Sequence, residues 1–329
     1  MSMVEFWAGA LSISILLYVL LDGFDLGIGL LFPFAPGQSA RGQMLAAISP
    51  VWDGNETWLV IAGTILFGAF PIVYATLLPA FYLPLFLMLG GLILRGVAFE
   101  FRYKTLRFRW LWDAGFVGGS YVAAFVQGTT VGALVQGLPI RNGIYVGGPF
   151  FWASPFAFLC GLGLCVGYAL IGACWIVAKC EGEIRKFARR SLPPLMVALL
   201  GFLVAAFFYA LVVDLPVLSR WTERPILLAF PMVGAAAFAL LAVSLRRGYD
   251  ALPFMCGATI FAAAFATLAV SFLPYIVPFS ITIQDAAAPE ASLRFLFWGA
   301  GLFVLPITLV YTGIVYFLFR GKAGSGEYS

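Results

Sequence analysis

The chain has 329 residues, of which 63% are hydrophobic and only 10% are charged, and its mean hydropathy is +1.01. Soluble domains carry about 25% charged residues, so this composition excludes an ordinary soluble protein and predicts an all-α polytopic membrane protein. The net charge of +4 requires no nucleic-acid partner, because the placement of the basic residues across a membrane accounts for it.

Apolar runs of about twenty residues predict nine transmembrane helices in a single integral-membrane domain, residues 1–329. Glu5 and the lack of a basic segment before the first run favour an uncleaved first helix. Pro71 and Pro79 are expected to break or kink the chain around the second and third spans. The predicted spans lie near 6–32, 51–74, 76–98, 114–138, 153–178, 194–213, 226–245, 251–274 and 295–319.

The basic residues predict the orientation of these spans. If the loop between the third and fourth spans is cytoplasmic, 15 of the 19 Lys and Arg residues fall on the cytoplasmic side of the membrane. This distribution follows the positive-inside rule. It predicts a periplasmic N-terminus and a cytoplasmic C-terminus.

Two carboxylates interrupt the first span, within Asp22-Gly-Phe-Asp-Leu-Gly-Ile-Gly29. An Asp at the centre of a membrane helix costs about 2.5–3.5 kcal/mol, so such residues are expected to face a protein interior or a wet path. Asp22 and Asp25 are three residues apart and share a helix face. Gly23 and Gly27 form a pair of small residues that lets another helix approach closely.

Further charges are predicted at the cytoplasmic end of the next spans. Asp53 and Glu56 open the second span, Arg95 and Glu100 close the third, and Asp113 opens the fourth. Because desolvation favours a neutral carboxyl group, a row of such groups can take up and pass on protons, with Arg95 holding one neighbour ionised. Alternatively, Arg95 pairs with Glu100 or Asp113, and Asp53 and Asp113 are first-turn acids favoured by the helix dipole.

The absence of His excludes the usual haem ligation, a His-based metal site and a His general base on this chain. The five Cys form no Cys-x-x-Cys pair, and we expect those in apolar runs to be packing residues. Trp52 and Trp58 flank the polar stretch of the second span on different helix faces. At least one of these two side chains is therefore expected to pack in the core.

Four motifs together resemble those of cytochrome bd-type quinol oxidase subunit II. They are the stretch from Asp22 to Gly29, Trp52-Asp-Gly-Asn-Glu-Thr-Trp58, Leu94-Arg-Gly-Val-Ala-Phe-Glu100 and Trp112-Asp-Ala-Gly115. They occur in the family's order and cover the N-terminal third of the chain. The short length is similar to that of the cyanide-insensitive branch of the family.

The resemblance implies a heterodimer in the bacterial inner membrane that oxidises quinol and reduces O₂ to water. Its haem-bearing subunit I would carry two haems b and either a haem d or a third haem b. A small single-span accessory subunit and a bound quinone are further expectations. This chain itself would bind no haem and no metal, and it would contain no catalytic residue.

The resemblance also associates Asp22, Asp25 and Asp53 with cytoplasmic proton uptake and Trp58 with an oxygen route to the haems. Position 56 is Glu where some members of the family have Gln, so Glu56 either alters the proton path or is merely solvated.

Two other functions are compatible with the same residues. A proton-coupled transporter would use these carboxylates, but the odd number of spans and the lack of a matching second cluster oppose it. A structural scaffold would use the acids as contacts with a partner. Replacing Asp53 by Asn separates the readings, because proton delivery predicts an assembled but slow oxidase and a scaffold predicts lost assembly.

Overall fold

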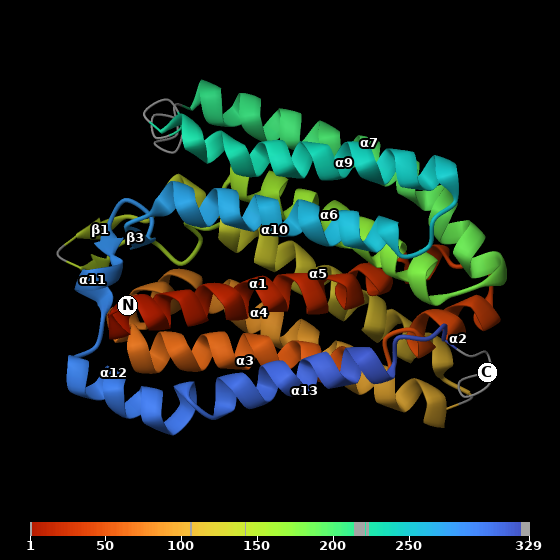
Figure 1. Ribbon diagram of the computed structural model, residues 1–329, viewed down its shortest axis with the longest axis horizontal. Helices are drawn as coiled ribbons and strands as arrows, with labels where there is room; N and C mark the ends of the chain where they lie inside the picture. The colour runs from red at the N-terminus through yellow and green to blue at the C-terminus, as the bar shows by residue number, and fades with distance from the viewer. Residues whose placement is uncertain (1, 106, 142, 214–220, 222–223, 324–329) are drawn as a thin grey trace.

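A bundle of long helices with nearly parallel axes makes up the protein (Figure 1). The computed structural model describes residues 2–105, 107–141, 143–213, 221 and 224–323. Two short antiparallel hairpins, formed by β1 with β2 and by β3 with β4, lie near the end of the bundle that holds the N-terminus.

The helices are α1 (Met3–Leu31), α2 (Gln38–Ala46), α3 (Trp52–Ala69), α4 (Pro71–Lys104), α5 (Arg109–Gln136), α6 (Pro155–Lys179), α7 (Gly182–Val212), α9 (Ala229–Arg247), α10 (Leu252–Phe272), α11 (Ile283–Ala286), α12 (Glu290–Leu296) and α13 (Val304–Leu318). The strands are β1 (Ile140–Arg141), β2 (Ile144–Tyr145), β3 (Tyr275–Val277) and β4 (Ile281–Thr282).

Seven helical stretches among the described residues are long and apolar enough to cross a membrane. They are Met3–Phe34, Pro71–Lys104, Pro155–Lys179, Gly182–Val212, Pro225–Arg247, Leu252–Phe272 and Glu290–Leu318. The prediction of a helical, multi-pass membrane protein is therefore confirmed. Helices α3 and α5 cover the second and fourth predicted spans but are not among these seven.

The break between the second and third predicted spans lies earlier than expected. Helix α3 ends at Ala69 and α4 begins at Pro71, with Phe70 between them, whereas the sequence placed the boundary after residue 74. Proline suits the first turn of a helix because its missing N–H would be unpaired there in any case. Pro79 lies inside α4, where the torsion angles of Phe81 (φ −124°, ψ 18°) mark a kink.

The last predicted span is interrupted. Between α12 and α13 the chain forms a π-helical segment at Phe297–Gly301, so this stretch is two helices joined by a wider turn. In contrast to α1, helix α13 has no buried residue and lies on the outside of the bundle (Figure 1).

Helix α1 is central, and every residue from Asp22 to Leu31 is buried. Its close neighbour is α6, because Gly27 and Gly172 meet with their backbones in contact. A Cβ atom on Gly27 would lie 1.8 Å from the carbonyl oxygen of Tyr168, and one on Gly23 would lie 2.6 Å from the Tyr168 ring. Close approach at small residues is a main source of helix association in lipid, where the hydrophobic effect contributes little.

We expect Gly27→Leu to separate α1 from α6 and to lower the free energy of unfolding by at least about 1–3 kcal/mol, the usual cost of overpacking. Thermal denaturation of the purified complex in detergent measures the effect. Gly9→Leu is the matched control, because Gly9 lies on the same helix and a Cβ there meets nothing within 4 Å. Equal melting temperatures for the two variants would contradict the prediction.

Candidate functional site

A buried guanidinium joins three helices in the interior of the bundle. Arg95 of α4 donates a hydrogen bond of 2.6 Å from Nη2 to Oδ1 of Asp22 on α1, and a second one to Oε1 of Glu56 on α3. The Arg95 side chain is 2% exposed and that of Asp22 is 0% exposed, whereas Glu56 is 26% exposed. Arg95 therefore links a fully buried carboxylate on α1 to a partly exposed one on α3.

The second buried carboxylate has its own partners. The Asn55 side-chain nitrogen donates to Oδ2 of Asp25 at 2.8 Å and to the carbonyl oxygen of Leu21 at 3.2 Å. The Tyr316 hydroxyl on α13 in turn donates to Oδ1 of Asn55 at 2.9 Å. Helices α1, α3 and α13 thus meet at the Asn55 amide.

A third polar group lies one turn further along α1. The Gln127 side-chain nitrogen on α5 donates to the Tyr18 hydroxyl at 2.7 Å, and the Tyr168 hydroxyl on α6 donates to Gln127 Oε1 at 2.8 Å. Tyr18 lies on α1 one turn before Asp22. The polar interior therefore extends from Glu56 and Arg95 along α1 towards the middle of the bundle.

The charges in this interior do not balance. Arg95 pairs with Asp22 and Glu56, and Asp25 lies one turn from Asp22 as a third carboxyl group. Within the part of the chain that the structure describes, Asp22 Oδ2, Asp25 Oδ1 and Arg95 Nη1 are buried without a hydrogen-bond partner. Since buried charges need a counter-charge or a proton, this cluster is neutral only when carboxyl groups carry protons.

A separate ionic group lies nearer the end of the bundle, and in it the guanidinium groups outnumber the carboxylate. Asp113 of α5 accepts hydrogen bonds from Arg102 of α4 and, at 3.1 Å, from Arg41 of α2. Both guanidinium groups also lie 5.4 Å from the centre of the Phe32 ring. The alternative that Arg95 pairs with Glu100 or Asp113 is therefore wrong. Arg95 binds Asp22 and Glu56 instead, and Asp113 binds the two other arginines.

The remaining residues singled out from the sequence lie outside these networks. Asp53 is exposed in the first turn of α3, and Glu100 is exposed on α4, where it forms no ion pair with any residue in the described ranges. Trp58 is buried at 1% exposure, and its indole N–H has no hydrogen-bond partner among the described residues.

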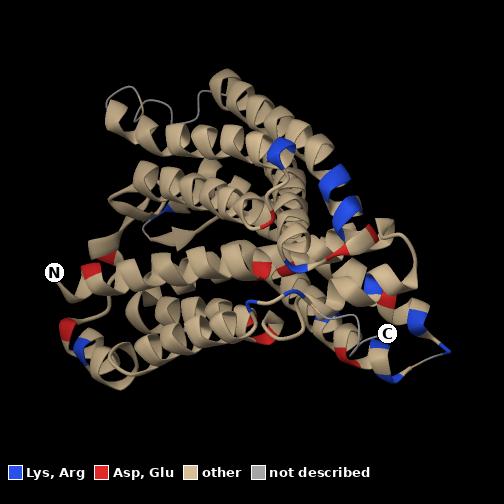
Figure 2. Ribbon diagram, turned by 45° about the vertical axis from the view of Figure 1, so that its right-hand side comes forward, with Lys and Arg blue, Asp and Glu red and all other residues tan. Residues whose placement is uncertain are grey.

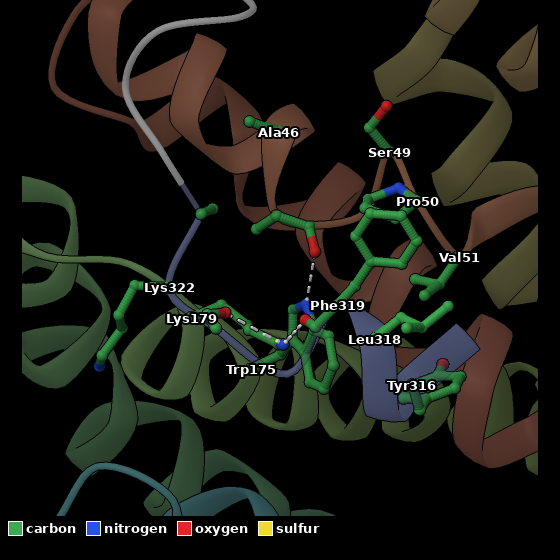
Figure 3. Close-up of a pocket in the computed structure, with 13 residues that line it drawn as sticks. Ala46, Ser49, Pro50, Val51, Trp175, Lys179, Tyr316, Leu318, Phe319 and Lys322 are labelled. Atoms are coloured by element: carbon green, nitrogen blue, oxygen red, sulfur yellow. Dashed lines mark hydrogen bonds between the residues drawn. The ribbon is translucent and has the colours of Figure 1, made fainter. Parts of the chain in front are cut away.

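A cavity of about 610 Å³ opens at the C-terminal end of the bundle (Figure 3). It lies between the α2–α3 connection, the end of α6 and the end of α13. Its walls are Ala46, Ala47, Ser49, Pro50, Val51, Trp175, Lys179, Tyr316, Leu318, Phe319, Gly321, Lys322 and Ala323. Tyr316 is therefore shared between the cavity wall and the Asn55 contact.

Hydrogen bonds fix the cavity walls. The Lys179 ammonium donates to the carbonyl oxygens of Phe319 and, at 3.3 Å, of Gly321 (Figure 3). Trp175 donates its indole N–H to the Ala47 carbonyl oxygen at 3.0 Å. Lys322 pairs with Asp250 at 3.0 Å. Partial burial would raise the pKa of Asp250, but hydrogen bonds from Lys322 and Arg185 hold that pKa below its ordinary value.

Several of these polar residues were not predicted as site residues. Asn55 stands within the Trp52–Trp58 motif, and its place between two acids was the available signal. Tyr18, Gln127, Tyr168 and Tyr316 are isolated in apolar helices, where a Tyr is equally typical of packing. They lie up to 261 positions from their hydrogen-bond partners, so no local sequence pattern could have identified those partners.

The family model for cytochrome bd terminal oxidase subunit II matches residues 3–319. This chain belongs to that family. It is therefore a subunit of a terminal oxidase, an oxidoreductase complex in which a subunit I is its partner. The resemblance inferred from the four motifs is confirmed.

Individual relatives agree over nearly the whole length. The chain is 29% identical to cytochrome bd-I ubiquinol oxidase subunit 2 of Escherichia coli (strain K12), covering 96% of this chain and 94% of the relative. It is 28% identical to cytochrome bd ubiquinol oxidase subunit 2 of Bacillus subtilis (strain 168), covering 99% and 98%. It is also similar in fold to a chain of the bd oxidase from Geobacillus thermodenitrificans, with a TM-score of 0.75 at 18% identity and coverage of 97% and 99%.

A haem or metal ligand in this chain would have to come from side chains other than His. The sequence contains no His. Among the described residues no three His, Cys, Asp or Glu side chains are placed to hold a metal ion. Cys174 and Cys256 are free and buried, and Cys174 lies beside Gly257.

We expect Arg95→Met to destabilise the complex by about 3–5 kcal/mol, because it leaves buried carboxylates without their counter-charge. The yield of assembled complex after mild-detergent purification measures the loss. Adding Asp22→Asn to Arg95→Met should restore part of that yield, since it removes a charge that the first substitution leaves unpaired.

Glu100→Gln is the matched control for these variants, because Glu100 is an exposed acid on the same helix as Arg95. It should assemble like the unmodified chain. A double variant no better assembled than Arg95→Met would show that the charge imbalance does not cause the defect.

Proposed function

We propose that this chain is the non-haem subunit II of a bd-type quinol oxidase in the bacterial inner membrane, and that it supports assembly and delivers cytoplasmic protons. The observation that carries the proposal is the buried cluster of Asp22, Asp25, Glu56 and Arg95. The names of the Escherichia coli and Bacillus subtilis relatives support quinol as the electron donor.

The chemistry of O₂ reduction requires a supply of protons, which such a cluster can support. Forming two molecules of water consumes four electrons and four protons, and protons do not cross dry hydrocarbon unaided. A group of carboxyls with more negative charges than counter-ions can hold a proton and release it to a neighbour. Asp22 and Asp25 lie deep on α1, so they extend this capacity into the protein interior.

Each predicted proton-path residue has a place in this proposal. Asp53, exposed at the start of α3, collects protons, and Glu56 is the partly exposed member of the cluster. Glu100 adds a further acid at the same end of the bundle, and the Arg102–Asp113–Arg41 group fixes the helix ends around it. The buried side chain of Trp58, on α3, lines a route for oxygen.

The haems are assigned to subunit I: two haems b and either a haem d or a third haem b. This assignment follows from the resemblance to the bd-type quinol oxidase family, and it agrees with the absence of His from this chain. A quinone and a small single-span accessory subunit complete the proposed complex. The contribution of this chain is to bind subunit I, to exclude lipid from the charged interior and to hold protons at the carboxyl groups of α1 and α3.

We also propose nine membrane crossings, with α3 and α5 among them, a periplasmic N-terminus and a cytoplasmic C-terminus. Figure 2 supports this orientation, since Lys and Arg gather at the end of the bundle that holds the C-terminus and are scarce at the other end. Arg185, Lys186, Arg189 and Arg190 form one such group at the start of α7. The positive-inside rule places that end in the cytoplasm.

We expect Asp25→Asn to lower oxidase turnover about tenfold or more, a loss of about 1.4 kcal/mol or more of barrier lowering. The amide keeps the shape of the side chain but cannot hold a proton at that atom. Quinol oxidase activity per haem of purified complex measures turnover, and the reduced-minus-oxidised spectrum checks assembly. Asp53→Asn should also assemble and show slower turnover.

Glu290→Gln serves as the acid-to-amide control, because Glu290 is an exposed acid in the first turn of α12, paired with the equally exposed Arg294. Wild-type turnover in an assembled Asp25→Asn variant would remove proton delivery from the proposed function. Loss of assembly in both Asp25→Asn and Asp53→Asn would favour a structural role for the acids.

We expect α5 to cross the membrane, which cysteine labelling in whole cells can test. Gly148→Cys should react with a membrane-impermeant thiol reagent added outside, and Arg107→Cys should react after the membrane is opened. Both positions are exposed, one beyond each end of α5. The unmodified chain corrects for the native cysteines. Labelling of both positions from one side would contradict the crossing.

A further inference from the structure

The cavity at the C-terminal end of the bundle comes within one side chain of the buried carboxylates. Tyr316 lines the cavity, its hydroxyl donates to Asn55, and Asn55 donates to Asp25. Figure 3 shows the Tyr316 ring beside Val51 and Leu318 on the wall towards α3. The cavity lies at the same end as the basic residues that mark the cytoplasmic side.

We propose that this cavity is the cytoplasmic mouth of the proton path, and that Tyr316 is a positioning residue that holds Asn55 against Asp25 at its inner end. This inference rests on the proposed function and adds to it an entrance and a residue from the last helix. It differs from a path that enters only through Asp53 and Glu56 on α3.

The role of Tyr316 follows from the hydrogen bonds of one amide. The Asn55 nitrogen faces two acceptors, Asp25 Oδ2 and the Leu21 carbonyl, and its oxygen faces the Tyr316 hydroxyl. A reversed amide would place an oxygen against two oxygens and its N–H groups against a hydroxyl. The two acceptors set this orientation, and the Tyr316 hydroxyl anchors the amide in it by donating to the Asn55 oxygen.

Asn55 itself is not a relay, because an amide does not readily give up a proton. Its effect is to occupy Asp25 Oδ2 and to fix the orientation of that carboxyl. Asp25 Oδ1 is then the buried oxygen without a hydrogen-bond partner among the described residues. That atom is the position at which an incoming proton is held.

The cavity has the composition of a hydrated vestibule. It is large enough for many water molecules, since one water needs about 30 Å³ of liquid volume. Two lysines and several backbone groups lie on its wall beside apolar side chains. Lys179 holds the Phe319 and Gly321 carbonyls, so the segment that follows α13 is fastened across the cavity rim.

The first test removes the Tyr316 hydroxyl in the assembled oxidase. Tyr316→Phe should lower kcat roughly fivefold, the factor that one neutral hydrogen bond is worth, with an unchanged KM for quinol and an unchanged haem spectrum. Proton uptake by the reduced enzyme reacting with O₂, followed with a pH dye, should slow by a similar factor. Tyr311→Phe is the matched control, because Tyr311 is an exposed tyrosine on the same helix.

The second test obstructs the cavity. Ala46→Cys, modified in inside-out vesicles with a bulky thiol reagent, should lose most of its turnover, whereas the reagent should leave the unmodified chain unaffected. Labelling is quantified by mass spectrometry. Full turnover in the fully labelled variant overturns the cavity as the mouth of the path.

The outcomes separate this inference from the proposed function. Slow proton uptake in Asp25→Asn together with wild-type uptake in Tyr316→Phe and in labelled Ala46→Cys overturns the inference and leaves the proposed function standing. Wild-type uptake in Asp25→Asn overturns both. A fall in uptake for Tyr316→Phe that Tyr311→Phe does not show supports the entrance at the cavity.

Discussion

The guanidinium of Arg95 determines the arrangement of the helices around it. It binds acids on α1 and α3 in a medium where an unpaired charge is costly, so it fixes the register of three helices at once. The position of Arg95 is set by close packing of α4 against α5. A Cβ on Gly119 of α5 would lie 2.3 Å from the Gly91 carbonyl oxygen and 3.0 Å from the backbone nitrogen of Arg95. A glycine contact thus places the charge, and the charge in turn aligns the helices.

The two ionic groups differ in their ratio of carboxyl to guanidinium groups, and this difference suits one to a structural role and the other to proton binding. At the Asp113 group two arginines surround one carboxylate, and the aromatic ring of Phe32 supports both. That group is saturated and is suited to hold α2, α4 and α5 together. Around Arg95 the ratio is reversed, with three carboxyl groups to one guanidinium. Carboxyl groups in excess of their counter-ions can bind protons, whereas a carboxylate held by two arginines has little capacity to do so.

The sequence predicted those features that depend on near neighbours. Helix length follows from runs of apolar residues, and the shared face of Asp22 and Asp25 follows from their spacing of three. The partners of Arg95 could not be predicted, because Asp22 lies 73 positions away and equally plausible acids lie closer. A break or kink at Pro71 was expected, but the span boundary was placed after residue 74 because Pro71 is compatible both with a kink and with a helix start. The role of Tyr316 depends on a hydrogen bond to a residue 261 positions away, which local sequence patterns do not predict.

The long sequence separation between α1 and its partners constrains how the protein is made. Asp22 and Asp25 leave the ribosome before Arg95 has been synthesised, and Tyr316 follows only near the end of translation. Until then, each Asp costs about 2.5–3.5 kcal/mol at the centre of a lone helix in lipid. The two acids therefore offset much of the insertion free energy of the first helix until α4 supplies Arg95. A chain that ends before α4 keeps Asp22 in its first helix without the guanidinium that pairs with it in the complete bundle.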